Sequence, residues 1–193
     1  MANKDRCVSE EETKAVLKEA KTAYKKVAQD AADVGAVVHS YCEAIEQGLP
    51  FDEQAITGYV GYEKIKKCID RFKEWKAENK DEILRSEAIV GSVAHSYAGC
   101  FDRLSRRGKR VILSDWKTSS GIHLEYWLQL SAYVLAVKEW MDIDVDGMEI
   151  IRFGKDGKFE TEIVTKKSEI KDFTAQFLRN LQTYRFREAY DKF

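Results

Sequence analysis

The stretch Val111-Ile-Leu-Ser-Asp115-Trp-Lys117-Thr118 follows Ala98-Gly-Cys-Phe-Asp102 after a basic turn, Arg106-Arg107-Gly108-Lys109. The apolar run and the glycine in the turn predict a β-hairpin with one aspartate on each arm. Side chains two residues apart on a strand share a face, so we expect the Lys117 ammonium beside the Asp115 carboxylate. Two carboxylates and a lysine in this arrangement suit a divalent cation and a phosphate.

The alternative for Asp115-Trp-Lys117 is a solvated ion pair, which is common and contributes only about 0–1 kcal/mol to stability. The preceding apolar run argues instead for a buried strand. In that setting an unpaired charge is costly and persists with a partner, a metal or a catalytic role.

His39 lies beside the apolar stripe of a predicted helix. The stripe recurs at helical spacing in Val34, Val38, Tyr41, Cys42 and Ile45. A single histidine in such a place is more often a hydrogen-bonded core residue than a metal ligand. Glu87 lies on the strand-like run 82–90, where a solvent-facing role and a functional role fit the pattern equally well.

Gln129 and Tyr133 are four residues apart in a predicted helix and therefore share a face. An amide and a phenol that face a protein core are costly to bury unless they are paired. We therefore expect this helix face to look toward a polar cavity.

These polar positions occur in one order along the chain: Gly35-x3-His39, Glu87, Gly99-x2-Asp102, Asp115-x-Lys117-Thr118 and Gln129-x3-Tyr133. The set resembles the PD-(D/E)xK nuclease superfamily, in particular its RecB-like exonuclease branch as a stand-alone, phage- or prophage-type domain. The resemblance covers residues 39–133 and extends loosely to a strand near Ile150. It departs at Phe101, which stands where the superfamily's name has proline, a position that is not a ligand. No helicase motif accompanies these residues.

The resemblance implies an α/β fold with a restriction-endonuclease-like core, a mixed β-sheet flanked by helices. Strands are expected near 82–91, 95–104, 110–117, 147–153 and 158–165, the last two forming a second hairpin. Helices are expected from a capping box at Ser9 to about Asp30, from a cap at Asp33 through His39, before Lys80, over 123–140 and from Ser168. A length of 193 residues suits one domain. We divide it into an N-terminal helical extension (1–32), a catalytic core (33–165) and a C-terminal helix (168–193).

The resemblance also assigns roles to individual residues. The expected metal ligands are His39, Asp102, Asp115 and the main-chain carbonyl of Trp116, with Mg²⁺ or Mn²⁺ as the ion. The expected catalytic residues are Asp102, Asp115, Lys117, Glu87, Gln129 and Tyr133. The expected DNA-binding residues are Arg103, Arg106, Arg107, Lys109 and Thr118, because the basic turn follows the predicted site. For any one of the basic residues, a solubilising hairpin tip is an equal alternative.

The implied activity is metal-dependent hydrolysis of DNA phosphodiester bonds, expected as an exonuclease that leaves 5′-phosphates. The expected setting is recombination, repair or phage DNA processing, with a recombination or single-strand-annealing protein as a partner. One alternative is a catalytically silent DNA-binding member of the same fold, and another is a hydrolase of a different substrate. The presence of both Asp115 and Lys117 favours the active nuclease.

Composition narrows the remaining classes. The formal net charge of −1 does not identify a partner by itself. The lack of a long apolar run and of a signal pattern predicts a cytoplasmic protein without a membrane partner. The four cysteines, Cys7, Cys42, Cys68 and Cys100, form no Cys-x2-Cys pair, so we expect reduced, mostly buried thiols and no iron–sulfur cluster.

Overall fold

Five strands form one sheet in the computed structural model, which describes residues 10–190. The strands are β1 (Glu82–Ser92), β2 (Tyr97–Arg107), β3 (Arg110–Lys117), β4 (Gly147–Phe153) and β5 (Phe159–Val164), and they lie in this order across the sheet. Strands β3 and β4 pair in parallel, and the other neighbours are antiparallel. The mixed sheet and both predicted hairpins are therefore confirmed.

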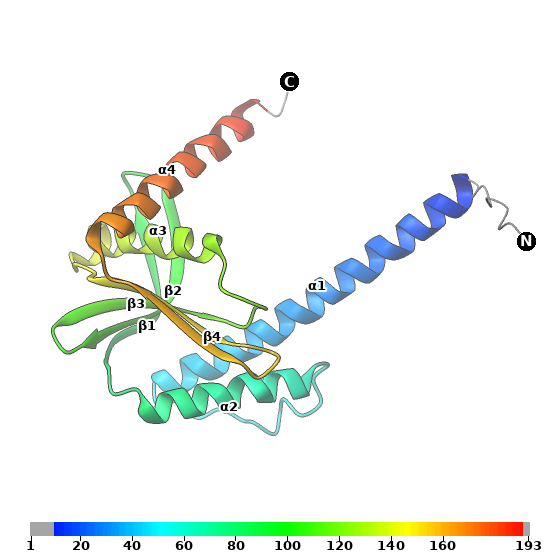
Figure 1. Cartoon of the computed structure of the whole chain (residues 1–193), viewed down its shortest axis with the longest axis horizontal. Helices are drawn as coiled ribbons and strands as arrows, with labels where there is room; N and C mark the ends of the chain where they lie inside the picture. The colour runs from blue at the N-terminus through cyan, green and yellow to red at the C-terminus, as the bar shows by residue number, and fades with distance from the viewer. Residues whose placement is uncertain (1–9, 191–193) are drawn as a thin grey trace, which may run out of the picture.

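Four helices cover the two faces of this sheet (Figure 1). They are α1 (Glu10–Glu46), α2 (Tyr62–Glu78), α3 (Leu124–Met141) and α4 (Lys167–Tyr190). On one face, α1 and α2 pack through Val38 and Phe72 against Trp116 of β3. On the other face, α3 and α4 pack through Leu130 and Ile170 in a core that includes Leu113 of β3. The alternation of Leu113 and Trp116 to opposite faces gives the sheet two separate cores, as expected for a strand buried on both sides.

Helix α1 is continuous, which corrects the prediction of two helices separated near Asp30 and Asp33. Residues 28–36 contain four alanines, the strongest helix former, and no proline. Asp33 does not cap a new helix, because its carboxylate accepts a hydrogen bond from Gln29 within the same helix at 2.7 Å. The division between N-terminal extension and core therefore falls inside one helix. The capping box at Ser9 lies outside the described residues.

Glycines make both hairpin turns possible. Gly108 adopts φ 63° between β2 and β3, and Gly157 adopts φ 85° between β4 and β5. Residues that carry a side chain rarely adopt this left-handed backbone region, so glycine is favoured at these positions. The first turn places Asp102 and Asp115 on adjacent antiparallel strands, as the sequence predicted.

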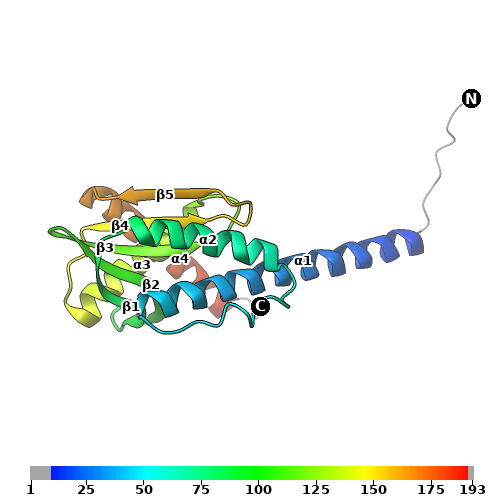
Figure 2. The same ribbon diagram turned by 90° about the horizontal axis from the view of Figure 1, so that it is seen from below.

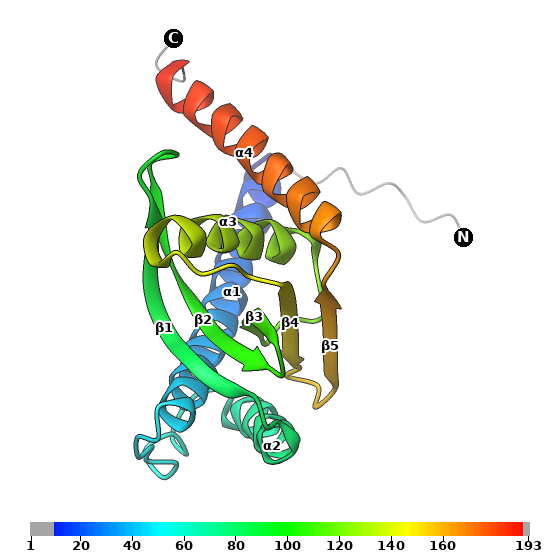
Figure 3. The same cartoon turned by 90° about the vertical axis from the view of Figure 1, so that its left-hand side faces the viewer.

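The aromatic residues of α4 differ in burial between the two halves of the helix. Phe173 stacks on Trp127 and Phe177 contacts Tyr97, with ring centroids 6.0 and 5.1 Å apart. Tyr184 is 60% exposed, because α4 extends past the sheet (Figures 1 and 3). Among residues 10–190, no helix combines the length and apolarity that crossing a membrane requires.

The cysteines that the structure describes are free thiols. Cys42 and Cys68 are buried, whereas Cys100 is exposed. Cys7 lies outside the described residues.

Candidate active site

Three possible metal ligands from different elements meet at one point. His39 comes from α1, Glu87 from β1 and Asp102 from β2, and one ligand atom of each lies within 4.8 Å of the others. The His39 Nδ1 atom is 3.5 Å from Asp102 Oδ1. One imidazole and two carboxylates form a donor set that suits Mg²⁺ or Mn²⁺. His39 and Asp102 thus converge as predicted, and Glu87 joins them.

Two hydrogen bonds from neighbouring strands fix the position of Asp102. The Trp116 N–H donates to Asp102 Oδ2 at 2.6 Å. The Ser86 hydroxyl donates to the main-chain carbonyl of Asp102 at 3.2 Å. Strand β3, which carries Asp115 and Lys117, therefore holds the carboxylate of Asp102. Ser86 of β1, the residue before Glu87, holds the main chain of Asp102.

Lys117 lies at the centre of a second cluster. Its Nζ is 2.5 Å from Asp115 Oδ2 and donates to Gln129 Oε1 at 3.1 Å. Gln129 Nε2 in turn donates to the Tyr133 hydroxyl at 3.0 Å. The ammonium also lies 4.7 Å from the centre of the Tyr126 ring, a cation–π contact. The expected pairing of Lys117 with Asp115 is confirmed, and α3 holds the ammonium from the other side.

The electrostatics of the two clusters reflect concentrated negative charge. Burial and then the charge of Asp102 raise the pKa of Asp115 to about 7, although Lys117 opposes this shift. Burial lowers the pKa of His39, but the hydrogen bond and charge of Asp102 outweigh it, so that the pKa is raised. Burial and Asp102 also raise the pKa of Glu87. A bound divalent cation would relieve this accumulation of charge.

Asp115 is itself only 2% exposed, yet its Oδ2 makes no hydrogen bond within the described chain. The Lys117 ammonium lies 2.5 Å from this oxygen and offsets part of its charge. A buried carboxylate oxygen without a directed donor is a position that a metal ion can satisfy. The residues therefore fit a divalent cation. Asp115 and the Trp116 carbonyl lie outside the three-residue group, and their roles as ligands stay predictions.

Glycines of the sequence motif let α3 and α1 approach the site. A Cβ added at Gly99 would lie 2.5 Å from Tyr133 Cε1, closer than real Cβ contacts allow. A Cβ added at Gly35 would lie 3.3 Å from Thr118 Oγ1. Gly99 therefore makes room for the tyrosine that ends the Lys117 chain of contacts, and Gly35 makes room for the loop after β3.

The sequence matches the family model described as the PD-(D/E)XK nuclease superfamily over residues 10–191. The chain belongs to this superfamily. No curated protein matches the chain in sequence.

Two solved structures can be compared with this superfamily member. A protein from Eubacterium rectale named "Putative exonuclease" aligns with 13% identity and a TM-score of 0.53 over 82% of this chain. This chain covers 66% of the Eubacterium rectale chain, and at this identity the likeness concerns the fold alone. A protein named SSO0001 aligns with 9% identity over 76% of this chain and 85% of its own, but its TM-score of 0.35 is too low to support an argument.

Arg103 does not take the DNA-binding role predicted for it in this superfamily member. Its side chain is fully buried and ion-paired with Glu46 and Asp81, at 3.5 and 3.3 Å. Its guanidinium also lies 5.2 Å from the centre of the Trp75 ring. A charge held by this many internal partners cannot reach a nucleic acid, so the prediction for Arg103 is wrong.

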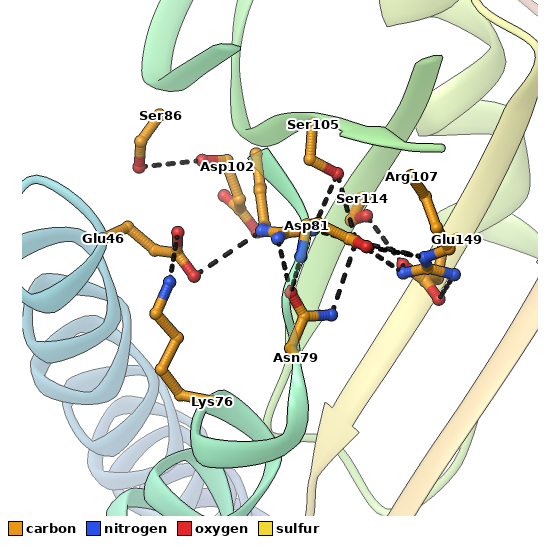
Figure 4. Close-up of polar contacts among 11 residues, drawn as sticks. Glu46, Lys76, Asn79, Asp81, Ser86, Asp102, Ser105, Arg107, Ser114 and Glu149 are labelled. Carbon is orange, nitrogen blue, oxygen red and sulfur yellow. Dashed lines mark hydrogen bonds and ion pairs between the residues drawn. The ribbon is translucent and has the colours of Figure 1, made fainter. Parts of the chain in front are cut away.

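A layer of polar contacts that includes Asp81, Arg107 and Glu149 crosses the sheet beside Asp102 (Figure 4). Arg103 joins this layer through hydrogen bonds to Asp81 and Asn79 at 3.3 and 3.0 Å. Arg107 donates to Asp81 at 2.8 Å and to Glu149 of β4 at 3.0 Å. Ser114 of β3 donates to the same Glu149 carboxylate at 2.9 Å. Buried ionic groups that satisfy one another resist separation, because removal of one leaves the others unpaired. The layer therefore joins the end of α2 to three strands of the sheet.

The other predicted DNA contacts differ in accessibility. Thr118 is buried, and its hydroxyl faces Gly35, which corrects its assignment to a DNA-binding surface. Arg106 is exposed and pairs with Glu82 at 2.8 Å. The hairpin tip begins five residues after Asp102, a distance of about 16 Å along a strand. It is therefore not adjacent to the candidate metal centre. DNA contacts by Arg106, Arg107 and Lys109 stay predictions.

Several residues at the site were not assigned a role from the sequence. Tyr126 contacts Lys117, and its position three residues before Gln129 could have placed it on the same helix face. The Cys100 thiol lies 3.4 Å from Glu87 Oε2 and precedes Asp102 by two residues on β2. Burial and Glu87 raise the pKa of Cys100 to about 11, which favours a protonated thiol that donates to the carboxylate. The hydrogen bond from the Trp116 main-chain N–H to Asp102 could not be predicted from the sequence, because it does not depend on the identity of the side chain at position 116.

Proposed function

We propose that this superfamily member is a divalent-metal-dependent deoxyribonuclease that hydrolyses phosphodiester bonds in DNA. The observation that carries the proposal is the convergence of His39, Glu87 and Asp102 beside the strand that bears Asp115 and Lys117. A nuclease needs a cation site and a separate protein cation close to it, and this arrangement supplies both.

His39, Glu87 and Asp102, together with Asp115 and the Trp116 carbonyl, would hold Mg²⁺ or Mn²⁺. A divalent cation supplies Lewis-acid chemistry, because it neutralises phosphate charge and makes water more acidic. The histidine among the donors favours Mn²⁺ without excluding Mg²⁺.

Lys117 would stabilise the charge that develops on the scissile phosphate. Its ammonium is held by Asp115, Gln129 and the Tyr126 ring, so it needs little reorganisation when charge develops. Tyr133 orients Gln129 through the hydrogen bond between their side chains. Gln129 and Tyr133 therefore act mainly as positioning residues for Lys117.

We further propose that the enzyme is an exonuclease of the RecB-like branch and leaves 5′-phosphates. The support is the order of the sequence motifs from His39 to Tyr133, in a chain that belongs to the PD-(D/E)XK nuclease superfamily. The biological setting would be recombination, repair or phage DNA processing, with a recombination or single-strand-annealing protein as a partner.

The proposal is tested with labelled linear duplex, single-stranded and circular DNA, each incubated with EDTA, Mg²⁺ or Mn²⁺. We expect cleavage of the linear substrates only with metal, and little cleavage of the circle. Ligation of the products without a kinase step would verify their 5′-phosphates. His39→Ala should abolish metal-dependent cleavage, whereas His95→Ala, which changes a histidine outside the ligand group, should not. DNA binding without cleavage under every condition would instead indicate a catalytically silent member.

A further inference from the structure

The first half of α1 extends beyond the sheet (Figures 1 and 2). This part of the helix carries a row of lysines. The row consists of Lys14, Lys18, Lys21 and Lys25, which border one hollow on the helix surface together with Leu17 and Thr22. Their spacings of four, three and four residues place them within a sector of about 60°, since each residue turns an α-helix by about 100°. These lysines therefore form a single line along the helix.

The lysine row points in the same direction as His39. At about 100° per residue, His39 lies about 20° from the direction of Lys14, although 25 residues separate them. The positions between Lys25 and His39 on this face are Ala28, Ala32 and Ala36, and all three are exposed. The rise of 1.5 Å per residue makes the distance from Lys25 to His39 about 21 Å. Gln29 borders this path at about 60° from the direction of Lys14, and no charged side chain of α1 stands on it between Lys25 and His39.

The charges of Lys18, Lys21 and Lys25 are not used to stabilise the helix. No acidic residue stands three or four positions before or after Lys18, Lys21 or Lys25. Like charges at these spacings destabilise a helix by about 0.2–0.5 kcal/mol for each pair. In the part of the chain that the structure describes, these three lysines form no ion pair, whereas Lys66 and Lys138 on other helices do.

The charge on this face changes sign at the candidate metal centre. Beyond His39, the next residue on the same face is Glu43, whose charge contributes to the raised pKa values of Glu87 and Cys100. A polyanion that reaches the site is therefore attracted by the lysines on one side and repelled by Glu43 on the other. This asymmetry gives a direction to an approaching strand.

We propose that the lysine row binds the phosphate backbone of DNA that extends from the cleavage position along α1. The inference rests on the proposed nuclease function and names the surface that holds the DNA outside the site. Its support is charge complementarity and the continuity of one exposed helix face from Lys14 to His39. The distance from Lys25 to His39 corresponds to about six base pairs of B-form DNA.

The test compares the salt dependence of DNA binding by wild type and by the triple variant Lys18→Ala, Lys21→Ala, Lys25→Ala. Fluorescence anisotropy is measured with a labelled duplex of about 25 base pairs in EDTA, at several salt concentrations. Each lost phosphate contact flattens the log–log slope by up to about 0.9, so we expect a change of up to about 2.7. Alanine is a strong helix former, and the variant should fold normally.

Two controls distinguish the effect of losing the lysine row from the effect of losing positive charge anywhere on the protein. Lys26→Ala removes a neighbouring lysine that points about 100° away from Lys25, and it should change the slope much less than Lys25→Ala. The triple variant Lys158→Ala, Lys167→Ala, Lys171→Ala removes the same charge from exposed positions elsewhere and should leave the slope near wild type. An equal change for the row and this control would overturn the proposal.

Other outcomes identify what the row does instead. An unchanged salt slope in the row variant overturns the proposal. If the hairpin variant Arg106→Ala, Lys109→Ala has a flatter salt slope instead, the DNA contacts the hairpin tip and not the row. A change in molar mass by light scattering with unchanged DNA binding would indicate a contact between copies, which also overturns it. Cleavage is measured separately with Mn²⁺. If wild type binds DNA with the expected salt slope but never cleaves it, the proposed nuclease activity is refuted and the proposed DNA binding by the lysine row still stands.

Discussion

The main-chain N–H of Trp116 holds one carboxylate oxygen of Asp102 at 2.6 Å, while the other oxygen lies 3.5 Å from His39 Nδ1. The carboxylate is thus oriented by a group that no side-chain substitution removes. Its free direction is toward the histidine of α1. The candidate metal centre is therefore built on a hydrogen bond from the main chain of β3 to a side chain of β2.

Glu87→Gln should weaken Mn²⁺ binding by about 10-fold or more, since loss of a direct carboxylate ligand should cost at least as much as loss of an outer partner. Isothermal titration calorimetry measures this directly. Glu43→Gln is the matched control, because Glu43 is a nearby acid outside the ligand group. Equal affinities for Glu87→Gln and wild type would exclude Glu87 from the metal centre.

Lys117→Ala should reduce single-turnover cleavage by about 10²–10³-fold, the typical loss for one contact to developing charge. It should also raise the pKa of Asp115 further, because the carboxylate loses its nearest cation. Rapid-quench measurements with saturating enzyme give the rate. Lys138→Ala, an exposed lysine on α3, is the control. Near wild-type cleavage by Lys117→Ala would show that the lysine serves structure alone.

The metal-free protein should become less stable as pH rises from about 4 to about 7. The pKa of Asp115 is about 7 in the folded chain, above its ordinary value of 3.8. Between these values the folded chain keeps a proton that the unfolded chain has released, so the free energy of unfolding falls by up to about 1.4 kcal/mol per pH unit. The raised pKa of His39 acts in the same direction, because its contribution is lost as pH rises through the folded pKa.

Urea unfolding in EDTA from pH 4 to pH 8 checks this expectation. Asp115→Asn cannot titrate and should show a flatter profile. Parallel profiles for wild type and Asp115→Asn would contradict the assignment of the raised pKa to this carboxyl group. Added Mn²⁺ should stabilise the wild type most above pH 7, where proton competition ends.

Gly99→Ala should reduce cleavage by displacing Tyr133, since the new Cβ would lie 2.5 Å from its ring. Overpacking of this kind typically costs about 1–3 kcal/mol of stability. In a Tyr133→Ala background the same substitution should have little further effect, and a double-mutant cycle measures this coupling. Gly58→Ala is the control, because nothing lies within 4 Å of the added atom. Additive effects would mean that Gly99 acts through something other than Tyr133.

Arg103→Met should destabilise folding by about 3 kcal/mol, the low end of the cost of breaking a buried ion pair. The cost is at the low end because Asp81 keeps its contact with Arg107 and Glu46 keeps its contact with Lys76. Chemical denaturation measures the loss. Binding of DNA by the fraction that remains folded should keep the wild-type salt slope. A flatter slope with unchanged stability would restore Arg103 to the DNA-binding surface.

The sequence was sufficient for the sheet because strand signals are local. The apolar run before Asp115 and the glycines of both turns determine the hairpins without reference to distant residues. The order of motif residues then identified His39, Asp102 and Lys117 for one site. Asp33 was misread because aspartate is common at helix starts, whereas its side chain here bonds within a helix that alanines continue.

Features that depend on contacts between distant segments were not predictable. Arg103 is buried because Glu46, Asp81 and Trp75 from other elements surround it, and none of these is near in sequence. In the sequence, a buried arginine near a basic turn cannot be distinguished from an exposed one. Glu87 joined the ligand group through the three-dimensional approach of β1 to α1, which its strand pattern alone could not indicate.

The continuity of α1 restricts how this chain can change in length. One residue inserted between Lys25 and His39 would turn the lysine row by about 100° relative to the histidine, and two would turn it by about 200°. Insertions of seven or eleven residues would restore the direction to within about 20°. If one face of α1 serves both the lysine row and His39, related sequences should differ in length in this segment by seven or eleven residues. An insertion of a single residue should uncouple DNA binding from cleavage without unfolding the protein.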